Sequence, residues 1–353
     1  MAMMLNLLPA ALAAALCAGA EPGWNAAAAA AYLDQRAAAW IERTAALNDS
    51  RAGCISCHTS LPYLLARPAL RAIGVPDAAV DHEISLLDPL KRLVRAWDSP
   101  PYYPARAPQS RGTQAILFAL LLARQDRQAG RDKPSPDTES AFLHLWSEQA
   151  RSGPNAGAWE WLQFDLDPWE TPEAAYFGAA LAAVAIGSAP GGYSARADIQ
   201  NNVVLLLDFL RSNRDGRTLH GRLPLLWAAA GLPRVLPEPE RTRLLDEIRA
   251  CQNEDGGWSI VALGPWKPRK EVALVSASDA YATAFTTFIL QQSGFNHRAA
   301  EVARAVGWLK AHQDQASGAW KTESLNKIRK PDDPAKNFMT DAATAYAALV
   351  LSR

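Results

Sequence analysis

The sequence predicts an all-helical protein of 353 residues in which helix pairs repeat along the chain. One observation is a turn of the form Gln…Gly-x-Trp, which occurs at 252–258 and again at 313–320, with the two tryptophans 62 positions apart. A second is that a matching helix start follows each turn, at Asp279 and at Asp341, which are also 62 positions apart. Two offsets that agree define an internal repeat.

Two kinds of helix alternate along the chain. One kind is rich in small residues and apolar nearly all round, as expected of a helix in the interior; these segments are 58–73, 111–124, 173–186, 220–230, 278–290 and 340–351. The other kind has one polar face, as expected of a helix that borders solvent; these segments are 26–46, 77–97, 138–150, 197–213, 238–251 and 298–313. Six inner and six outer helices, joined as hairpins, predict a closed double ring.

The repeated turns resemble the QW motifs of squalene–hopene cyclases. The small-residue-rich helices that start at Asp279 and Asp341 are similar to inner helices of prenyltransferase-type toroids. The match is clearest over residues 238–353. The resemblance implies an (α/α)₆ toroid, in which the Gln of each turn caps one element and the Trp stacks on the next, so these motifs imply structure and not catalysis.

The catalytic motif of class II terpene cyclases, Asp-x-Asp-Asp, is absent from the sequence. The nearest segment is Asp165-Leu-Asp167-Pro-Trp-Glu170, which lies in an aromatic-rich stretch before the third inner helix. It is a candidate proton-donor site, and also a candidate loop at the mouth of the ring that caps a helix or binds a polar group. Protein prenyltransferases bind zinc through Asp, Cys and His, and no cysteine lies near Asp279 or Asp341 to complete such a site.

Parallel inner helices would bring their first residues to one mouth of the ring. All the residues predicted there are ionisable: His58, Arg111, Glu173, His220, Asp279 and Asp341. Asp279 and Asp341 are good N-cap residues. Both are therefore candidates for helix capping and for a catalytic or ligand-binding role.

Residues 54–58 read Cys-Ile-Ser-Cys-His, the attachment motif of c-type haem. Two thiols at this spacing can add to the two vinyl groups of haem, and the adjacent histidine then lies under the iron. We therefore predict a covalent haem c on Cys54 and Cys57, with His58 as the iron ligand. A Cys54–Cys57 disulfide is the main alternative; a zinc site lacks a second Cys/His pair, and a thioredoxin-like redox pair lacks a βαβ pattern.

Candidates for a sixth ligand of the iron are Met339 and His220. Met339 is the only methionine in residues 21–353 and comes just before the helix start at Asp341. His220 begins another inner helix. An open or water-bound position is the third alternative.

Residues 1–20 form an apolar run that ends in Ala-Gly-Ala, the pattern that signal peptidase cleaves. The run contains no Lys or Arg, so an uncleaved anchor is the alternative. We predict a cleaved signal peptide, export to the periplasm, and a mature single domain over 21–353 with no transmembrane span. Covalent attachment of haem also takes place outside the cytoplasm.

The charge balance limits the partners. Lys and Arg together number 36, as do Asp and Glu. The chain therefore lacks the positive surface that nucleic acid attracts, and we expect no nucleic-acid partner. A small apolar ligand and a redox partner are the expected ones.

Three proline-containing loops, at 97–111, 264–270 and 321–336, are candidates for a lid over the mouth or for solvated connections.

Two functions follow from the sequence as a whole. The first is a haem-c toroid that acts in electron transfer or in oxidation of a small apolar molecule, an isoprenoid being one candidate. The second is a non-catalytic toroid that binds a ligand or a partner and carries a disulfide, and a cyclase is a more distant third.

Overall fold

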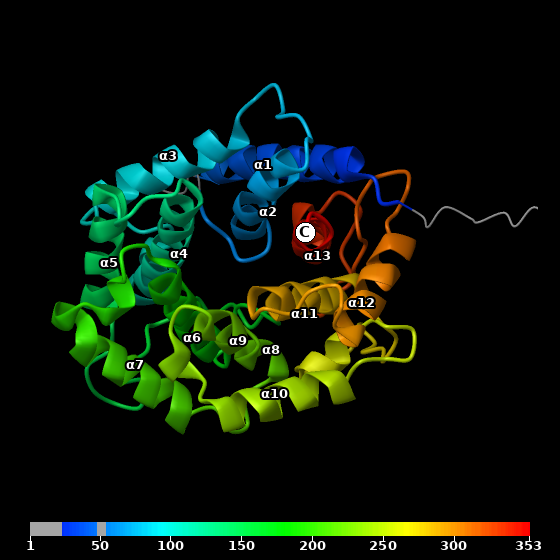
Figure 1. Ribbon diagram of the computed structural model, residues 1–353. Helices are drawn as coiled ribbons and strands as arrows, with labels where there is room; N and C mark the ends of the chain where they lie inside the picture. Colours follow the sequence, from blue (N-terminus) through cyan, green and yellow to red (C-terminus); the bar gives the residue numbers. More distant parts are fainter. Residues whose placement is uncertain (1–22, 48–53) are drawn as a thin grey trace, which may run out of the picture.

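The computed structural model describes residues 23–47 and 54–353, and these residues are helical throughout, with turns and loops between the helices (Figure 1). The helices are α1 (Ala26–Leu47), α2 (Ser60–Ala72), α3 (His82–Arg95), α4 (Ala107–Gln128), α5 (Pro136–Glu148), α6 (Ala174–Ser188), α7 (Gln200–Ser212), α8 (Leu219–Arg222), α9 (Pro224–Ala229), α10 (Glu238–Ala250), α11 (Ala280–Gln292), α12 (Ala300–Ala311) and α13 (Phe338–Leu351). Short 3₁₀ helices lie at Pro104–Arg106, Tyr193–Ala195, Ala197–Ile199, Pro233–Val235, Ile260–Leu263 and Pro334–Asn337. The prediction of an all-α protein is confirmed. The predicted signal peptide at 1–20 lies outside the described residues.

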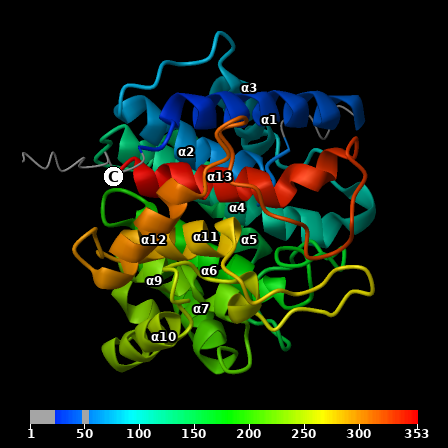
Figure 2. The same cartoon turned by 90° about the vertical axis from the view of Figure 1, so that its right-hand side faces the viewer.

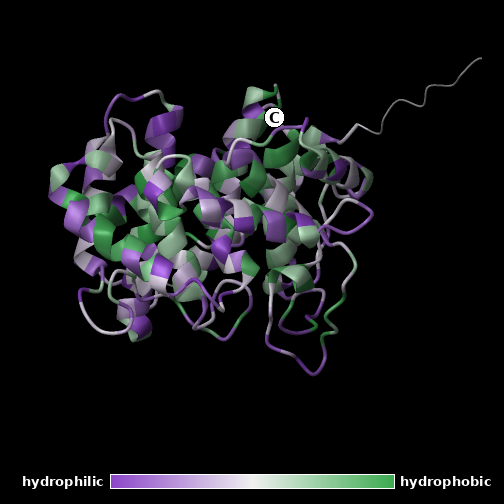
Figure 3. Cartoon of the chain, turned by 60° about the horizontal axis from the view of Figure 1, so that its bottom comes forward, coloured by the Kyte–Doolittle hydropathy of each residue, from purple (hydrophilic) through white to green (hydrophobic). Residues whose placement is uncertain are grey.

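The helices form an inner and an outer layer (Figure 1). In the inner helix α6 nearly every residue from Ala174 to Ser188 is buried, which fits a segment that is apolar all round. In the outer helix α10 the buried side chains are Leu244, Leu245 and Ile248, which form one stripe. Hydrophobic residues accordingly concentrate on helices in the middle of the molecule, and the loops are mostly hydrophilic (Figure 3).

The inner helices contact one another in a continuous order. α2 packs on α4, α4 on α6, α6 on α9, α9 on α11 and α11 on α13. α13 then packs on α2, so the last inner helix lies beside the first (Figure 2). One hydrophobic core therefore runs from α1 to α13.

The repeated Gln…Gly-x-Trp turns make the same hydrogen bonds wherever they occur. Gln252 donates from Nε2 to the carbonyls of Gly256 (2.8 Å) and Glu301 (2.9 Å), and the Trp258 indole donates to the carbonyl of Ile248 (2.9 Å). Each turn thereby joins its own outer helix to the start of the next one. This agrees with the structural role that the resemblance implies.

The structure adds a third turn of this kind, at Gln149 to Trp159, which the sequence comparison missed. Gln149 donates from Nε2 to the carbonyls of Gly157 and Asn202, at 3.0 Å each. The Trp159 indole donates to the carbonyl of Leu145 at 2.6 Å. In this copy the Gln and the Gly are farther apart in the sequence than in the other two, so the pattern is harder to recognise.

The turn at Gln313 joins the end of the chain to its beginning. Gln313 Oε1 accepts from the backbone N–H of Asn25 (2.7 Å), and its Nε2 donates to the carbonyls of Asn25 (3.0 Å) and Gly318 (2.9 Å). Asn25 directly precedes α1. Gln313 and Asn25 are 288 positions apart in the sequence, so this is a long-range contact. It brings the last outer helix next to the first.

Two of the differences between the predicted and the observed helices have a local cause in the sequence. The segment 220–230 is divided into α8 and α9, because Pro224 has no N–H to continue the hydrogen-bond ladder. The segment 77–97 starts later than predicted, at His82, where the Asp81 side chain accepts from the backbone N–H of Ile84 (2.9 Å) and caps α3.

Within the described residues, no helix combines the length and the apolar character that a membrane span requires.

Candidate functional site

Two neighbouring cavities lie where the inner helices begin. The larger, here called the His58 cavity, has a volume of about 410 Å³ and is lined by Trp40, Arg43, Thr44, Leu47, Cys54, His58, Tyr103, Phe164, Leu166, Asp167, Trp169, Glu170, Ser324, Asn326, Arg329, Ala335, Phe338 and Met339. The smaller, here called the His220 cavity, has a volume of about 190 Å³ and is lined by Asp165, Asp167, Pro168, Thr171, Pro172, Glu173, Ala174, Phe177, Thr218, His220, Gly221, Pro265, Trp266 and Lys267. All three loops that were candidates for a lid contribute residues to these walls.

The Cys-Ile-Ser-Cys-His segment forms a tight turn before α2. Ser56 Oγ accepts from the backbone N–H groups of Thr59 and Ser60 at 3.2 Å each, which satisfies donors that the start of the helix leaves open. The Trp40 indole of α1 donates to the carbonyl of Cys54 at 2.6 Å. The segment is therefore fixed both to its own helix and to the first outer helix.

The His58 imidazole is enclosed by aromatic rings. It stacks on Phe338, with 3.7 Å between ring centroids and 13° between planes, and Trp40 meets it edge-on at 5.1 Å. Trp169 lies 5.9 Å away. Burial, with Arg36, Arg43 and Arg329 nearby, lowers the pKa of His58 to about 3, so the imidazole is neutral at physiological pH.

A chain of hydrogen bonds determines which nitrogen of His58 carries the proton. Asp341, only 1% exposed, accepts from Arg36 Nε (2.7 Å), Arg36 Nη2 (3.1 Å), the Tyr32 hydroxyl (2.9 Å) and the Thr59 hydroxyl (2.8 Å). Burial raises the pKa of this carboxyl and Arg36 opposes the rise. Four donated hydrogen bonds on two oxygens favour the carboxylate.

Because the Thr59 hydroxyl gives its hydrogen to Asp341, its oxygen can only accept from His58 Nδ1, at 2.8 Å. His58 is therefore the Nδ1–H tautomer, and its Nε2 keeps a lone pair. Within residues 23–47 and 54–353, Nε2 has no hydrogen-bond partner. This is the arrangement in which proteins hold metal-ligating histidines.

Both cysteines of the motif are thiols in the structure. Cys54 lines the His58 cavity and is 5% exposed. Burial raises the pKa of Cys57 well above its ordinary range, and the nearby Glu170 and Cys54 add to the effect. In the part of the chain that the structure describes, no group of three or more His, Cys, Asp or Glu side chains could hold a metal ion.

The two sixth-ligand candidates lie in different cavities. Met339, 3% exposed, lines the His58 cavity together with Cys54. His220 lines the other cavity. Trp169 and Tyr281 lie between the two histidines, because Trp169 lies 5.9 Å from His58 and donates to the Tyr281 hydroxyl, which in turn contacts His220. Met339 therefore shares a cavity with His58, and His220 does not.

The three acidic residues of the 165–170 segment have different environments. Asp165 is 53% exposed and pairs with Lys267 (2.5 Å) and Arg269 (3.0 Å), which lower its pKa. Asp167 is 7% exposed and lines both cavities, and burial raises its pKa. Glu170 faces the His58 cavity, where burial raises its pKa to about 7. A proton donor in this segment would accordingly be Glu170 or Asp167 and not the ionised Asp165.

The two inner-helix aspartates have different roles. Asp279 is an N-cap as predicted: its side chain accepts from the backbone N–H of Ala282 at 2.9 Å. Burial raises its pKa to about 6. The prediction that Asp341 starts its helix as a cap is wrong, because α13 begins three residues earlier, at Phe338, and the carboxylate faces α1 and α2 instead. Neither residue lines the two cavities.

Arg111 and Glu173 complete the residues predicted at the mouth. α4 begins at Ala107, so Arg111 lies in its second turn, where the guanidinium donates to the carbonyls of Trp97 and Ser99. Glu173 lines the His220 cavity and pairs with Arg217 at 3.0 Å. Of the six predicted residues, His58, Glu173 and His220 border the cavities.

Sequence reasoning missed the residues that support His58. Thr59 directly follows the motif, and Tyr32 and Arg36 are four positions apart on one face of α1, which is the available signal. Nothing in the sequence places that face against Asp341, 305 positions after Arg36. Trp40 and Phe338 were missed for the same reason.

The raised pKa of the Glu170 carboxyl predicts how the stability of the protein depends on pH. Its folded pKa of about 7 lies above the value of about 4.3 for an unfolded chain. Between these values the unfolded chain releases a proton that the folded protein retains, so rising pH favours unfolding. We expect the urea midpoint of the wild type to fall, relative to Glu170→Gln, between about pH 4.5 and about pH 7.5.

His58 and His220, whose pKa values are lowered to about 3, change stability in the opposite direction, because acid protonates them in the unfolded chain first. Both are present in the two proteins, so the difference between the midpoint profiles isolates Glu170. Parallel profiles across this range would contradict the prediction.

No known protein family matches the chain, and no curated protein matches it either.

Proposed function

We propose that this chain is an exported (α/α)₆ toroid that carries a covalent c-type haem on Cys54 and Cys57, with His58 as the iron ligand. It acts in electron transfer, or in oxidation of a small apolar molecule, an isoprenoid being one candidate. Support for the ring comes from the order of contacts among inner helices, in which α13 packs on α2, and from the Gln313 turn that joins the last outer helix to the first. Support for export comes from the apolar run at 1–20.

The observation that carries the haem proposal is the Nε2 lone pair of His58. Thr59 and Asp341 hold the imidazole as the Nδ1–H tautomer. The cavity that His58 borders also contains the Cys54 side chain and, at about 410 Å³, falls within the range of cofactor sites. Haem, when bound, supplies a one-electron iron couple.

The chain's own residues would determine the environment of that group. His58 would hold it, and the Thr59 hydroxyl would keep the ring oriented and raise its basicity. Trp40, Phe338 and Trp169 would exclude water from the ligand. Met339, which lines the same cavity, would be a second side chain able to bind the iron.

The sequence also offered a cyclase and a disulfide-bearing binding toroid. A cyclase would need a neutral acid in an aromatic cavity, and Glu170 meets this description better than Asp165. A disulfide-bearing binding toroid requires Cys54 and Cys57 to be oxidised to one another. The following experiment distinguishes this alternative from haem.

The test is expression in the periplasm of a host with cytochrome c maturation machinery, followed by a haem-stained denaturing gel and an intact mass. We expect the wild type to gain the mass of one haem and Cys54→Ala/Cys57→Ala to gain none. Cys251→Ala is the matched control, since Cys251 is half-buried in another part of the chain and should leave attachment unchanged. A bare polypeptide lighter by two hydrogens would instead establish the disulfide.

A further inference from the structure

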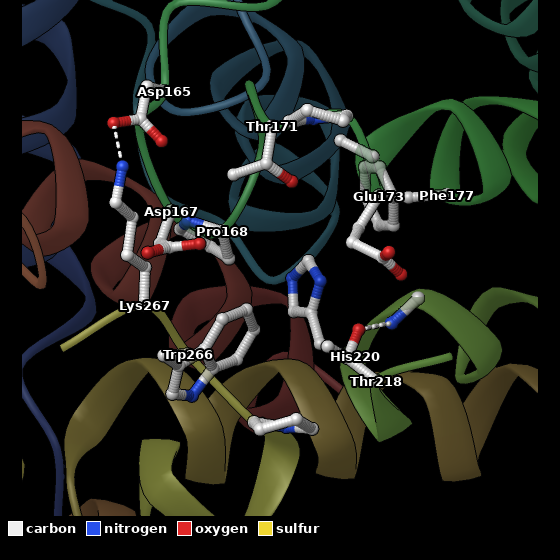
Figure 4. A pocket seen from close by; sticks show the side chains of 14 residues that line it. Asp165, Asp167, Pro168, Thr171, Glu173, Phe177, Thr218, His220, Trp266 and Lys267 are labelled. Carbon is white, nitrogen blue, oxygen red and sulfur yellow. Dashed lines mark hydrogen bonds and ion pairs between the residues drawn. The ribbon is translucent and has the colours of Figure 1, made fainter. Parts of the chain in front are cut away.

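The His220 cavity is distinct from the proposed haem site. Its walls combine the apolar side chains of Phe177, Trp266 and Pro168 with a few polar groups. The His220 ring, 1% exposed, points into the space between Asp167 and Glu173 (Figure 4). A volume of about 190 Å³ is slightly larger than that of an engineered cavity that binds benzene, about 150 Å³.

The direction of the hydrogen bonds around His220 can be assigned. The Trp169 indole can only donate, so Tyr281 accepts from it through its hydroxyl oxygen at 3.1 Å. The Tyr281 side chain is fully buried, and the one acceptor within reach of its hydroxyl hydrogen among the described residues is His220 Nε2, at 2.8 Å. His220 is therefore the Nδ1–H tautomer.

This Nδ1–H donor has no hydrogen-bond partner in the described ranges, 23–47 and 54–353. His220 lines the cavity, so a ligand with an acceptor oxygen would give this donor a partner. Burial lowers the pKa of His220 to about 3, so the ring offers a neutral donor at physiological pH.

Charges around the cavity are balanced in pairs. Glu173 pairs with Arg217, and Asp165 pairs with Lys267 and Arg269. Arg269 also lies 3.6 Å from Asp167. Each of the three acidic groups that line the cavity thus has a basic side chain within 4 Å, which favours a neutral ligand over an ion.

We propose that the His220 cavity binds a small, neutral, aromatic molecule that carries a carbonyl or hydroxyl oxygen. The oxygen accepts a hydrogen bond from His220 Nδ1–H, and the ring packs against the apolar side chains that line the cavity, Phe177, Trp266 and Pro168. The inference does not rest on haem, because no residue of the Cys-Ile-Ser-Cys-His motif lines this cavity.

The test compares two probes of nearly the same shape, acetophenone and α-methylstyrene, of which only the first has an oxygen. We expect titration calorimetry on the full chain to show acetophenone binding about tenfold tighter, as one hydrogen bond to an otherwise unpaired donor predicts. His220→Phe keeps a ring and removes the donor, so it should abolish this preference. His297→Phe, at an exposed histidine, is the matched control and should retain it.

A second measurement covers the case in which His220→Phe does not fold. Long-range ¹H–¹⁵N spectra of the wild type should show His220 protonated at Nδ1, with a resonance that shifts on addition of acetophenone and not of α-methylstyrene. Equal binding of both probes, or an Nε2–H tautomer, would overturn the proposal. Cys54→Ala/Cys57→Ala should bind acetophenone like the wild type, so loss of haem and loss of this site are distinguishable.

Discussion

Asp341→Ala should lower the free energy of unfolding by about 3–5 kcal/mol, the cost of removing one partner of a buried ion pair. The carboxylate is 1% exposed and accepts from two helices besides its own, through Tyr32 and Arg36 of α1 and through Thr59 at the start of α2. Without it the Arg36 guanidinium, 13% exposed, keeps a charge with no counterion in reach of Nε among the residues that the structure describes. The measurement is urea-induced unfolding followed by circular dichroism.

Asp198→Ala is the matched control for this variant. Asp198 also accepts two hydrogen bonds from one arginine, Arg196 (3.1 and 2.6 Å), but the pair lies at the surface. Exposed ion pairs are screened by solvent, so this variant should unfold nearly as the wild type does. Equal effects of the two substitutions would show that the network joining α1, α2 and α13 does not form in solution.

Gly318→Ala should destabilise the protein by about 3 kcal/mol, from strain and crowding together. Gly318 belongs to the turn of Gln313 and has φ of +75°, a region that residues with a side chain rarely adopt. An added Cβ would lie 2.3 Å from the carbonyl carbon of Ala28 in α1. Either the turn or the start of α1 must shift.

Gly153→Ala separates these two causes. Gly153 has almost the same φ, +79°, but nothing lies within 4 Å of an added Cβ. Its substitution should cost only the conformational strain, about 1–2 kcal/mol. The excess loss in Gly318→Ala then measures the contact between the last turn and the first helix. If the two losses are equal, that contact is absent and the outer layer does not close.

The helices and their layers could be predicted from the sequence, because the local periodicity of apolar residues decides which face of each helix is buried. A segment such as 173–186 has no polar face to turn toward solvent, and it becomes the buried helix α6. The exceptions also have local causes: Pro224 divides one inner helix, and Asp81 moves the start of an outer one. The Gln and Trp of two of the three turns could be recognised as a repeat because the same hydrogen bonds select the same residues at a similar spacing.

The sequence also identified Cys54, Cys57 and His58 as the candidate site, since their chemistry depends on a spacing within one turn of chain. It could not determine the protonation of His58, which depends on Asp341, 282 positions away from Thr59. The pKa of Glu170 could not be predicted from the sequence either. It depends on desolvation by the walls of a cavity, which segments distant in the sequence form together.

Only the tertiary structure decided which ionisable residues face a cavity. Asp279 and Asp341 occupy corresponding places in the repeat, and yet one caps its helix while the other pairs with Arg36. His220 has no distinguishing neighbour in sequence, but Tyr281 fixes its tautomer and directs its second nitrogen into a separate space. Local pattern specifies helices because their hydrogen bonds are local, whereas the charge state and the direction of a side chain depend on contacts that form only when the inner helices pack together.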